Sequence, residues 1–486
     1  MKVEVVVAAA MTDKVVALIT AAAKTGSIGD GKCSWRHSRR RFGSEPASAG
    51  TTQSNREEDR MTRWLGVIVV GVALVAAGVP AYGQTLFQNP LAPLAQAPPT
   101  ETKPGEAKPE EKKEEKPKTL WEENTLFAYV ESSWVWNTGR AGQDHINNEL
   151  RVFDNEDRWT FNMAEFSIKK DPSERYPFGY GLVLTAGIPG TTNDSQKVHA
   201  LGIFRGDSDV YPFRNTANFD LEEAYGSYQI PIGEGLTIKA GKFVTLLGYE
   251  TIESPNNLNF SRSFMFGFSI PFTHVGALLS YSPFPWLALT AGPVVGWDVA
   301  RDNNSRMSVM GQVGVSAVKD LALSLSWITG PEQAGQNSNP RTVLSSVGTY
   351  TGIKNLTLGA NVDYGWEEDE ASLAASGTRA NNNASWWGWA GYVAYDWTEQ
   401  LRTALRLEYF QDSDGIRTLA VAPGSRVELY EVTATVQYKI WKGLVGRLEY
   451  RHDSADNKVF ANRAPGNVPT GKTQNTLTLA LYYSFF

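Results

Sequence analysis

The last eleven residues constrain the fold of this chain more than any other segment. Apolar side chains occupy every second position from Leu477 to Phe485, and the positions from Thr476 to Ser484 between them are mostly small or polar. Because strand side chains alternate between two faces, the segment predicts a strand with one apolar and one polar face. A membrane β-barrel needs such an outward apolar stripe; an edge strand of a soluble sandwich is the alternative.

Composition favours an exported protein without cysteine chemistry. The mean hydropathy of −0.30 argues against a bundle of membrane helices but allows a barrel, whose lumen and loops are polar. The single cysteine, Cys33, lies ahead of the segment that we expect to be exported. No disulfide, metal thiolate or cysteine nucleophile is therefore expected in the mature protein.

Residues 61–83 predict a secretory signal peptide. A short basic start at Met61-Thr62-Arg63 precedes an apolar core, and Ala81-Tyr82-Gly83 places small residues at −3 and −1 before Gln84. A permanent anchor helix is the alternative, although the apolar core is shorter than the ~20 residues that a span needs.

Residues 1–32 resemble the C-terminal half of a PII nitrogen-regulatory protein. The resemblance lies in Lys2-Val3-Glu4-Val5-Val6-Val7 and in the run from Ala21 to Lys32. It implies no working PII domain, because the half with the regulatory loop is missing. We hypothesise that residues 1–60 are a frameshifted remnant of an upstream gene and that Met61 is the true start; a peptide from this region in mass spectra of the native organism would contradict this.

Residues 84–119 predict a periplasmic linker. They are rich in Pro, Glu and Lys, as in the run from Pro109 to Pro117, and hold too few apolar side chains to fold alone. The linker is therefore expected to be disordered or extended. A peptidoglycan-binding or trimerising coiled coil is the alternative, which the prolines and the missing heptads disfavour.

Residues 120–486 predict an all-β fold, a transmembrane antiparallel β-barrel of about 16 strands. Short and long connections alternate along the segment, as between the periplasmic turns and extracellular loops of a barrel. An even strand number is what such a barrel requires. The strands are expected near residues 125–137, 158–169, 178–188, 219–230, 235–244, 272–281, 286–297, 306–318, 320–329, 341–351, 355–366, 384–395, 399–410, 426–439, 443–452 and 473–486.

Charged side chains share one face of the clearer strands. Leucines alternate with them, and an arginine facing lipid near the midplane would cost about 2 to 4 kcal/mol, so the charges are expected to face the lumen. Ion pairs without a part in solute selection are the alternative. The candidate pore-lining residues are Arg402, Arg406, Glu408, Arg447, Glu449, Arg451 and Asp363.

Clustered aromatic residues predict membrane-interface girdles, because amphipathic rings favour the headgroup level. Lumen-facing rings that stack on sugars are the alternative. The densest group is Trp386, Trp387, Trp389, Tyr392, Tyr395 and Trp397.

A specific block carries a family resemblance. Gly241-Lys242-Phe243 is followed by a long connection and by Pro271-Phe272-Thr273-His274-Val275-Gly276. This block resembles the OmpL-like β-barrel porin family, and the resemblance implies a porin over about residues 120–486 without implying any ligand set. On physical grounds the connection could fold inward and narrow the pore through Glu250, Glu253 and Arg262, or cap the rim.

The expected function is passive diffusion of small hydrophilic solutes or ions through an outer-membrane porin. A non-conducting barrel that acts as an adhesin or structural surface protein is the alternative. No enzyme, cofactor or metal site is expected, because the five histidines lie outside nucleophile or metal-ligand motifs. The terminal Phe486 is expected to signal to the barrel-assembly machinery. Other expected partners are outer-membrane lipid, lipopolysaccharide and a second copy in a homo-oligomer, but no nucleic acid.

The net charge of the exported part of the chain predicts only a mild preference for one sign of ion. Residues 1–83 hold 11 of the 46 lysines and arginines and 7 of the 52 acidic residues, which leaves 35 against 45 in the rest. This excess predicts a mild cation preference if it lies in the pore. The candidate lumen arginines argue in the opposite direction for one wall.

Overall fold

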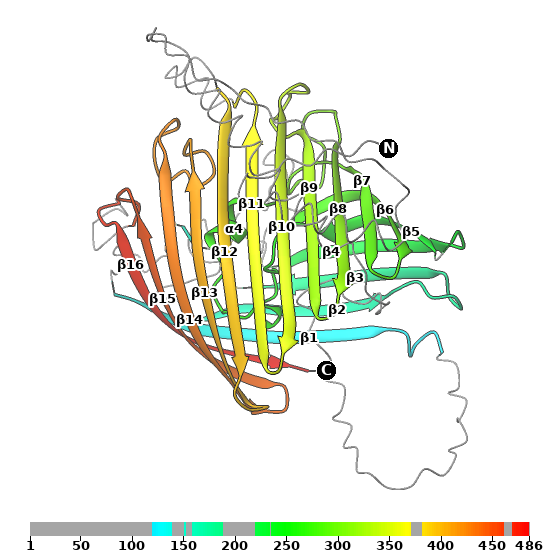
Figure 1. Cartoon of the computed structure of the whole chain (residues 1–486), viewed down its shortest axis with the longest axis horizontal. Helices are drawn as coiled ribbons and strands as arrows, with labels where there is room; N and C mark the ends of the chain where they lie inside the picture. Colours follow the sequence, from blue (N-terminus) through cyan, green and yellow to red (C-terminus); the bar gives the residue numbers. More distant parts are fainter. Residues whose placement is uncertain are drawn as a thin grey trace, which may run out of the picture. The chain divides into compact units, whose positions relative to one another are not determined.

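The computed structural model describes residues 119–138, 150–151, 158–187, 219–233, 235–370, 382–460 and 469–485. These residues form sixteen strands that close into a barrel (Figure 1). The strands are β1 Thr125–Asn137, β2 Arg158–Lys170, β3 Phe178–Ala186, β4 Phe219–Ile230, β5 Leu236–Val244, β6 Thr273–Phe284, β7 Leu287–Val294, β8 Ser308–Val318, β9 Leu321–Pro331, β10 Pro340–Ile353, β11 Leu356–Glu367, β12 Ala384–Asp396, β13 Leu401–Asp412, β14 Val427–Trp441, β15 Leu444–Ala455 and β16 Thr473–Ser484.

Every strand pairs antiparallel with its neighbours in the chain, and β1 pairs with β16 to close the barrel. In that closing pair Trp134 lies opposite Leu479. The all-β barrel class and the strand number predicted from the sequence are confirmed. Residues 1–60, the signal peptide, the linker except its last residue, and Phe486 fall outside the described residues.

Tight turns join strands at one end of the barrel. The connections β8–β9, β10–β11 and β14–β15 have two residues each, and the second of the two has a positive φ: Asp320 at 60°, Asn355 at 65° and Gly443 at 79°. Asp, Asn and Gly tolerate this left-handed conformation better than other residues. The longer connections, including 245–272 and 413–426, lie at the other end.

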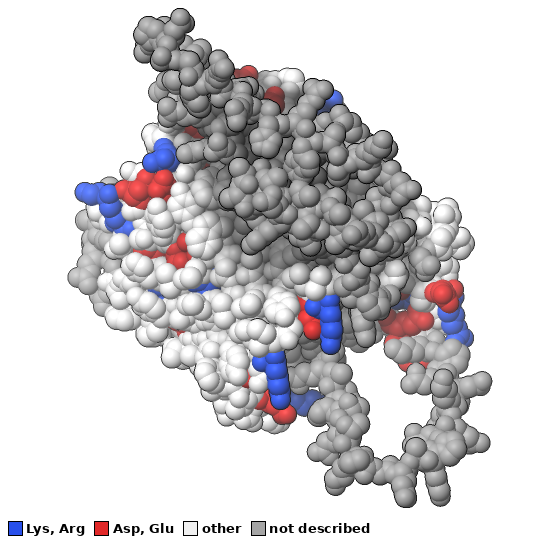
Figure 2. Space-filling model, viewed as in Figure 1, with Lys and Arg blue, Asp and Glu red and all other residues white. Residues whose placement is uncertain are grey.

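The outer face of the barrel is apolar. Leu407 and Leu448 are 41% and 49% exposed, whereas Arg406 and Glu449, one residue away, are 0% and 1% exposed. The visible described surface is mostly uncharged, with charged side chains in small separate groups (Figure 2). On the outside of β12–β14, Trp387, Tyr409 and Tyr430 form a row with ring centroids 5.0 and 5.1 Å apart. Such a surface suits lipid.

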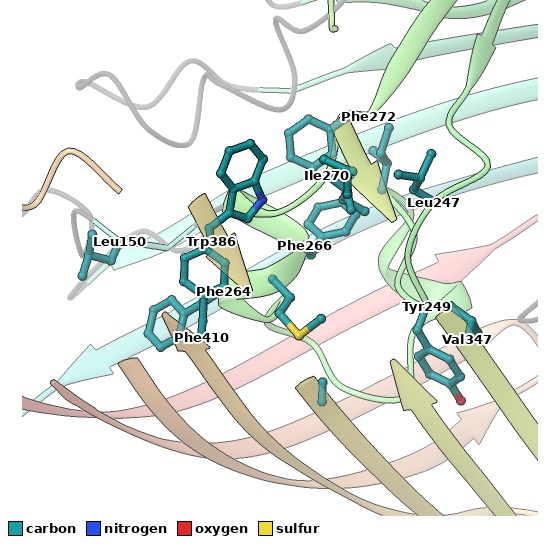
Figure 3. Packing of buried hydrophobic residues seen from close by; sticks show 14 of the residues in the cluster. Leu150, Leu247, Tyr249, Phe264, Phe266, Ile270, Phe272, Val347, Trp386 and Phe410 are labelled. Atoms are coloured by element: carbon teal, nitrogen blue, oxygen red, sulfur yellow. The ribbon is translucent and has the colours of Figure 1, made fainter. Parts of the chain in front are cut away.

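Helix is nearly absent from the described residues. The connection between β5 and β6 carries the 3₁₀ turn η3, Ser254–Asn256, and the short helix α4, Phe264–Phe268. None of the described helices is long and apolar enough to cross a membrane. Phe264 and Phe266 of α4 lie inside the barrel in one apolar cluster with Trp386 and Phe410 (Figure 3).

Candidate functional site

The connection 245–272, here called the inner loop, follows the inside of the barrel wall from β8 towards β15. The Leu246 carbonyl accepts hydrogen bonds from Gln312 of β8 (2.9 Å) and Ser326 of β9 (2.7 Å). Farther along, the Gly248 N–H donates to Ser345 of β10. The inner loop therefore crosses successive strands instead of capping the rim.

Asn361 and Tyr392 hold the next residue of the inner loop. The Tyr249 N–H donates to Asn361 Oδ1 of β11 at 2.8 Å. Its ring stacks on Tyr392 of β12 with centroids 4.2 Å apart. Stacked aromatic pairs add to the burial of their surface, so this contact fixes the loop laterally.

An ion pair then joins the inner loop to β13. Arg406 lies between the loop residue Glu250 and Glu431 of β14, with N–O distances of 2.5 and 2.8 Å. Arg406 also donates to the Ser261 carbonyl, and Glu250 accepts the Ser263 N–H. All three charged groups are buried, so each depends on the others for its compensation.

Two strand carboxylates bind the backbone of the inner loop. Glu449 of β15 accepts the N–H groups of Phe260 (2.6 Å) and Ser261 (3.0 Å). Glu408 of β13 accepts those of Phe264 (2.8 Å) and Met265 (2.6 Å) in the same manner, at the start of α4. Each carboxylate thereby satisfies two consecutive backbone donors.

Two strand arginines bind carbonyl groups of the inner loop. Arg447 donates to the carbonyls of Ser254 and Asn257, both at 2.8 Å. Arg451 donates to the Arg262 carbonyl at 2.5 Å, and its guanidinium lies over the Phe264 ring. Arginine and carboxylate side chains of one wall together replace water around the loop backbone.

The returning part of the inner loop passes β12 again. Trp386 Nε1 donates to the Ser269 carbonyl, and Arg417 Nε donates to that of Phe268. The Arg417 guanidinium stacks on Trp386 at 5.0 Å. The prediction that Trp386 and Tyr392 belong to a lipid girdle was therefore wrong: both face the interior, because they alternate with outward Trp387 and Trp389.

The block that carried the family resemblance forms the root of the inner loop. His274 Nδ1 donates to the Gly296 carbonyl at 2.9 Å, and the other ring nitrogen, Nε2, lies 3.2 Å from Thr245 Oγ1. Asp298 accepts the N–H groups of Phe272 and Thr273. Desolvation raises the pKa of the Asp298 carboxyl to about 6, although both N–H donors lower it. These contacts join both ends of the loop to the connection after β7.

Most of the candidate pore-lining residues lie beneath the inner loop, and Arg402 lies apart from it. All face the interior, as the alternation predicted, but Arg406, Glu408, Arg447, Glu449 and Arg451 lie beneath the inner loop and bind it. Asp363 is also buried and accepts from Asn361. Arg402 stands apart near the tight-turn end, in a bidentate pair with Asp396. Their part in lining a pore stays a prediction.

The opposite wall, β1–β5, is rich in carboxylates. Glu131 of β1, Glu165 of β2, and Glu222 and Glu223 of β4 are buried inside the barrel. Lys169 pairs with Glu223 at 2.5 Å, and Lys242 pairs with Asp220 at 3.3 Å.

The candidate constriction residues occupy different surroundings. Glu250 forms an ion pair with Arg406 on the wall that the inner loop follows. Glu253 instead interacts electrostatically with Glu165 and Glu222 on the opposite wall. Arg262 donates to the loop carbonyls of Ile252 and Phe260, so its guanidinium braces the loop tip. Desolvation lowers its pKa.

Sequence analysis did not single out several groups that hold this site together. Glu431 and Asp453 lie on inward positions of β14 and β15, and Asp298 follows β7. Alternation with outward Tyr430 and Val432 was a usable signal for Glu431. Asp298 offered no such signal, because its partners lie 25 residues or more away in the chain.

Among the described residues, no group of three or more His, Cys, Asp or Glu side chains is arranged to hold a metal ion. No curated protein matches the chain. Several solved structures are similar to the chain at low sequence identity.

The outer membrane channel DcaP of Acinetobacter baumannii is 12% identical, with 74% of this chain and 97% of that chain covered and a TM-score of 0.48. The anion-selective porin from Comamonas acidovorans is 9% identical, with 74% and 99% covered and a TM-score of 0.49. Salmonella typhi OmpF in complex with daunomycin is 11% identical, with 74% and 97% covered and a TM-score of 0.48.

A family model described as "Putative beta-barrel porin-2, OmpL-like" matches residues 124–485. This range contains all sixteen strands, the inner loop and the root that His274 and Asp298 hold. The chain belongs to this family of OmpL-like β-barrel porins.

Proposed function

We propose that this protein is an outer-membrane porin through which small hydrophilic solutes and ions diffuse passively. The observation that carries the proposal is the family match over residues 124–485 on a closed sixteen-stranded barrel. The apolar outer face and the charged interior agree with it, since a porin separates lipid from an aqueous lumen. Diffusion involves no catalytic step and no cofactor.

The inner loop would set the shape of the proposed pore. A loop clamped along β8–β15 would narrow the proposed lumen from that side of the barrel. Rigid placement of the loop by buried ion pairs would keep that width constant. The proposed selective groups are therefore those of the loop tip and of β1–β5.

The proposal extends to export and assembly. Residues 61–83 would direct export, residues 84–119 would lie in the periplasm, and residues 1–60 would be absent from the mature protein. Phe486 would contact the barrel-assembly machinery, and lipopolysaccharide and outer-membrane lipid would surround the apolar outer face. A homo-oligomer is also proposed, to be tested by native mass spectrometry of the detergent-extracted protein.

Single-channel recording tests the function. The protein extracted from outer membranes of cells expressing the full chain is inserted into planar bilayers, and discrete conductance steps are expected. Heat-modifiable migration in detergent gels verifies that the same sample is folded. A folded barrel that never conducts would contradict the porin proposal and favour a surface barrel that acts as an adhesin.

A further inference from the structure

The connection 413–426, here called the mouth loop, is bound to the ends of two strands. Asp412 at the end of β13 accepts hydrogen bonds from the N–H groups of Arg417 (2.9 Å) and Thr418 (2.8 Å) and from the Thr418 hydroxyl (2.9 Å). The Asp414 carboxylate accepts the Ser385 N–H of β12 at 2.8 Å. These bonds hold the mouth loop at the end of the barrel where the longer connections lie.

The mouth loop also packs against the interior of the barrel. Its apolar side chains Ile416, Ala420 and Val421 contact the buried apolar cluster. The same cluster includes Phe264 and Phe266 of α4 in the inner loop (Figure 3). Displacement of either loop would therefore expose apolar surface that the two loops now cover together.

The Arg417 side chain of the mouth loop binds the backbone of the inner loop. Its Nε donates to the Phe268 carbonyl at 2.7 Å. The guanidinium lies 4.7 Å from the centroid of the Trp297 ring and 5.0 Å from that of Trp386, and the two rings meet edge to face. Because both rings attract the cation, they hold the guanidinium where Nε reaches the inner loop.

The bonded carbonyl lies where the inner loop needs a partner from outside. Phe268 is the last residue of α4, and the carbonyls of a final helical turn have no partner within their helix. The adjacent Ser269 carbonyl accepts from Trp386 of β12 at 3.1 Å. Loss of the Arg417 donor would leave the Phe268 carbonyl without this bond and loosen residues 264–272, the returning limb of the inner loop.

We propose that Arg417 is a positioning residue of the pore, through which the mouth loop holds the returning limb of the inner loop in one place. The inference rests on the proposed porin function and adds a second loop to the elements that set the width of that pore. A limb released from Arg417 has more than one position available to it. The current through the pore should then change between more than one level.

Single-channel recording of the full-length protein, extracted from outer membranes into planar bilayers, tests this role. The wild type is expected to show one dominant open level. Arg417→Met keeps an apolar stem but removes the donor, and transitions to other current levels should become more frequent by about twofold or more. Arg417→Lys retains the charge and should lie between the two. Arg426→Met is the matched control, because Arg426 ends the same loop and its side chain is 58% exposed beside Glu428.

The outcomes separate a positioning role from a role in stability alone. Arg417→Met with a lower melting temperature but wild-type current levels would overturn the proposal, as would an equal change in Arg426→Met; both results leave the porin function standing. A folded wild-type barrel without conductance would overturn both. If Arg417→Met does not fold, Thr418→Val carries the test, because it removes the hydroxyl bond to Asp412 and loosens the mouth loop with Arg417 retained. More frequent transitions are expected there too, and their absence would count against the proposal.

Discussion

The two halves of the barrel interior use the same residue types for different purposes. On β10–β15, arginines and carboxylates face each other and the inner loop, so that most of their charges are compensated within the protein. On β1–β5, carboxylates exceed the described lysines that pair with them. The inward charges of β10–β15 thus clamp the inner loop, whereas Glu131, Glu165 and Glu222 on the other wall each have a buried carboxylate oxygen without a hydrogen-bond partner among the described residues.

This difference changes how the charged strands are interpreted. Arg406, Arg447 and Arg451 stand on one face in the sequence and suggest a positively charged pore wall. In the structure their guanidinium groups bind the inner loop, which removes them from the field that a solute would meet. We therefore expect the charge selectivity of the proposed pore to depend on residues that the loop does not cover.

Substitution of Arg406 should have the largest effect. Arg406→Met leaves Glu250 buried without its ion-pair partner and leaves Glu431 with Arg451 alone, at 3.9 Å, and breaking a buried pair in this way costs about 3 to 5 kcal/mol. Urea unfolding followed by tryptophan fluorescence measures the loss, and altered single-channel conductance is expected as the loop is released.

Arg402→Met provides the control on the same face of β13. Its pair with Asp396 is partly exposed, so the expected cost is about 0 to 1 kcal/mol. Equal effects of the two substitutions would contradict the view that burial under the inner loop distinguishes these arginines.

Removal of the Glu449 carboxylate should have the next largest effect. Glu449→Ala leaves the N–H groups of Phe260 and Ser261 without their acceptor, at about 1 to 3 kcal/mol for each that stays unsatisfied. Faster cleavage within residues 245–272 by an added protease is the expected readout. Glu428→Ala serves as control, because Glu428 accepts from the exposed Tyr430 and binds no part of the loop; similar cleavage in both variants would argue against the clamp.

The root of the inner loop should respond to pH. The Asp298 pKa of about 6 lies above its ordinary value of 3.8, so its stabilising contribution is complete below about pH 3.8 and is lost as the pH rises through 6. The melting temperature of the wild type relative to Asp298→Asn should therefore fall between pH 4 and 6 and then level off. A difference that rises with pH over this interval would show that hydrogen bonding outweighs desolvation at Asp298.

The smallest effect is expected from Lys242 on the wall β1–β5. Lys242→Met leaves the Asp220 carboxylate without its ion pair and should raise the K⁺/Cl⁻ permeability ratio by less than about twofold. Reversal potentials measure the change. A shift towards anions would contradict the assignment of this wall as the one that solutes meet.

The strands could be predicted from sequence because their information is local. Period-two alternation and turn residues such as Asn355 and Gly443 lie within a few positions of the strand that they define. The predicted strand ends differ from those in the structure by up to three residues. The strand expected to end at residue 281, for example, continues to Phe284 as β6. The facing of Arg406 and Leu407 followed from the same alternation.

The candidate site could be predicted only in part. The inner loop and its charged residues were identified, but the choice between folding inward and capping the rim was left open, because it depends on contacts such as Arg447 with Ser254, 193 positions apart. Trp386 was misassigned because its hydrogen-bond partner Ser269 lies 117 positions away in the chain. Glu222 is an extra residue of β4 opposite β3, because Leu221 and Glu223 pair with adjacent residues of β3. The alternation of residues within one strand does not reveal such a β-bulge.

The clamp on the inner loop has a consequence for how such a pore can change over generations. Glu408, Glu449, Arg447 and Arg451 bind mainly backbone groups of the loop, which every residue except proline at a donor position supplies. Loop side chains other than Glu250 and Arg262, which themselves hold the loop, can then be exchanged while its path along the wall is retained. A lineage carrying this barrel is free to alter which solutes pass by a few substitutions at the tip, without rebuilding the scaffold that holds it.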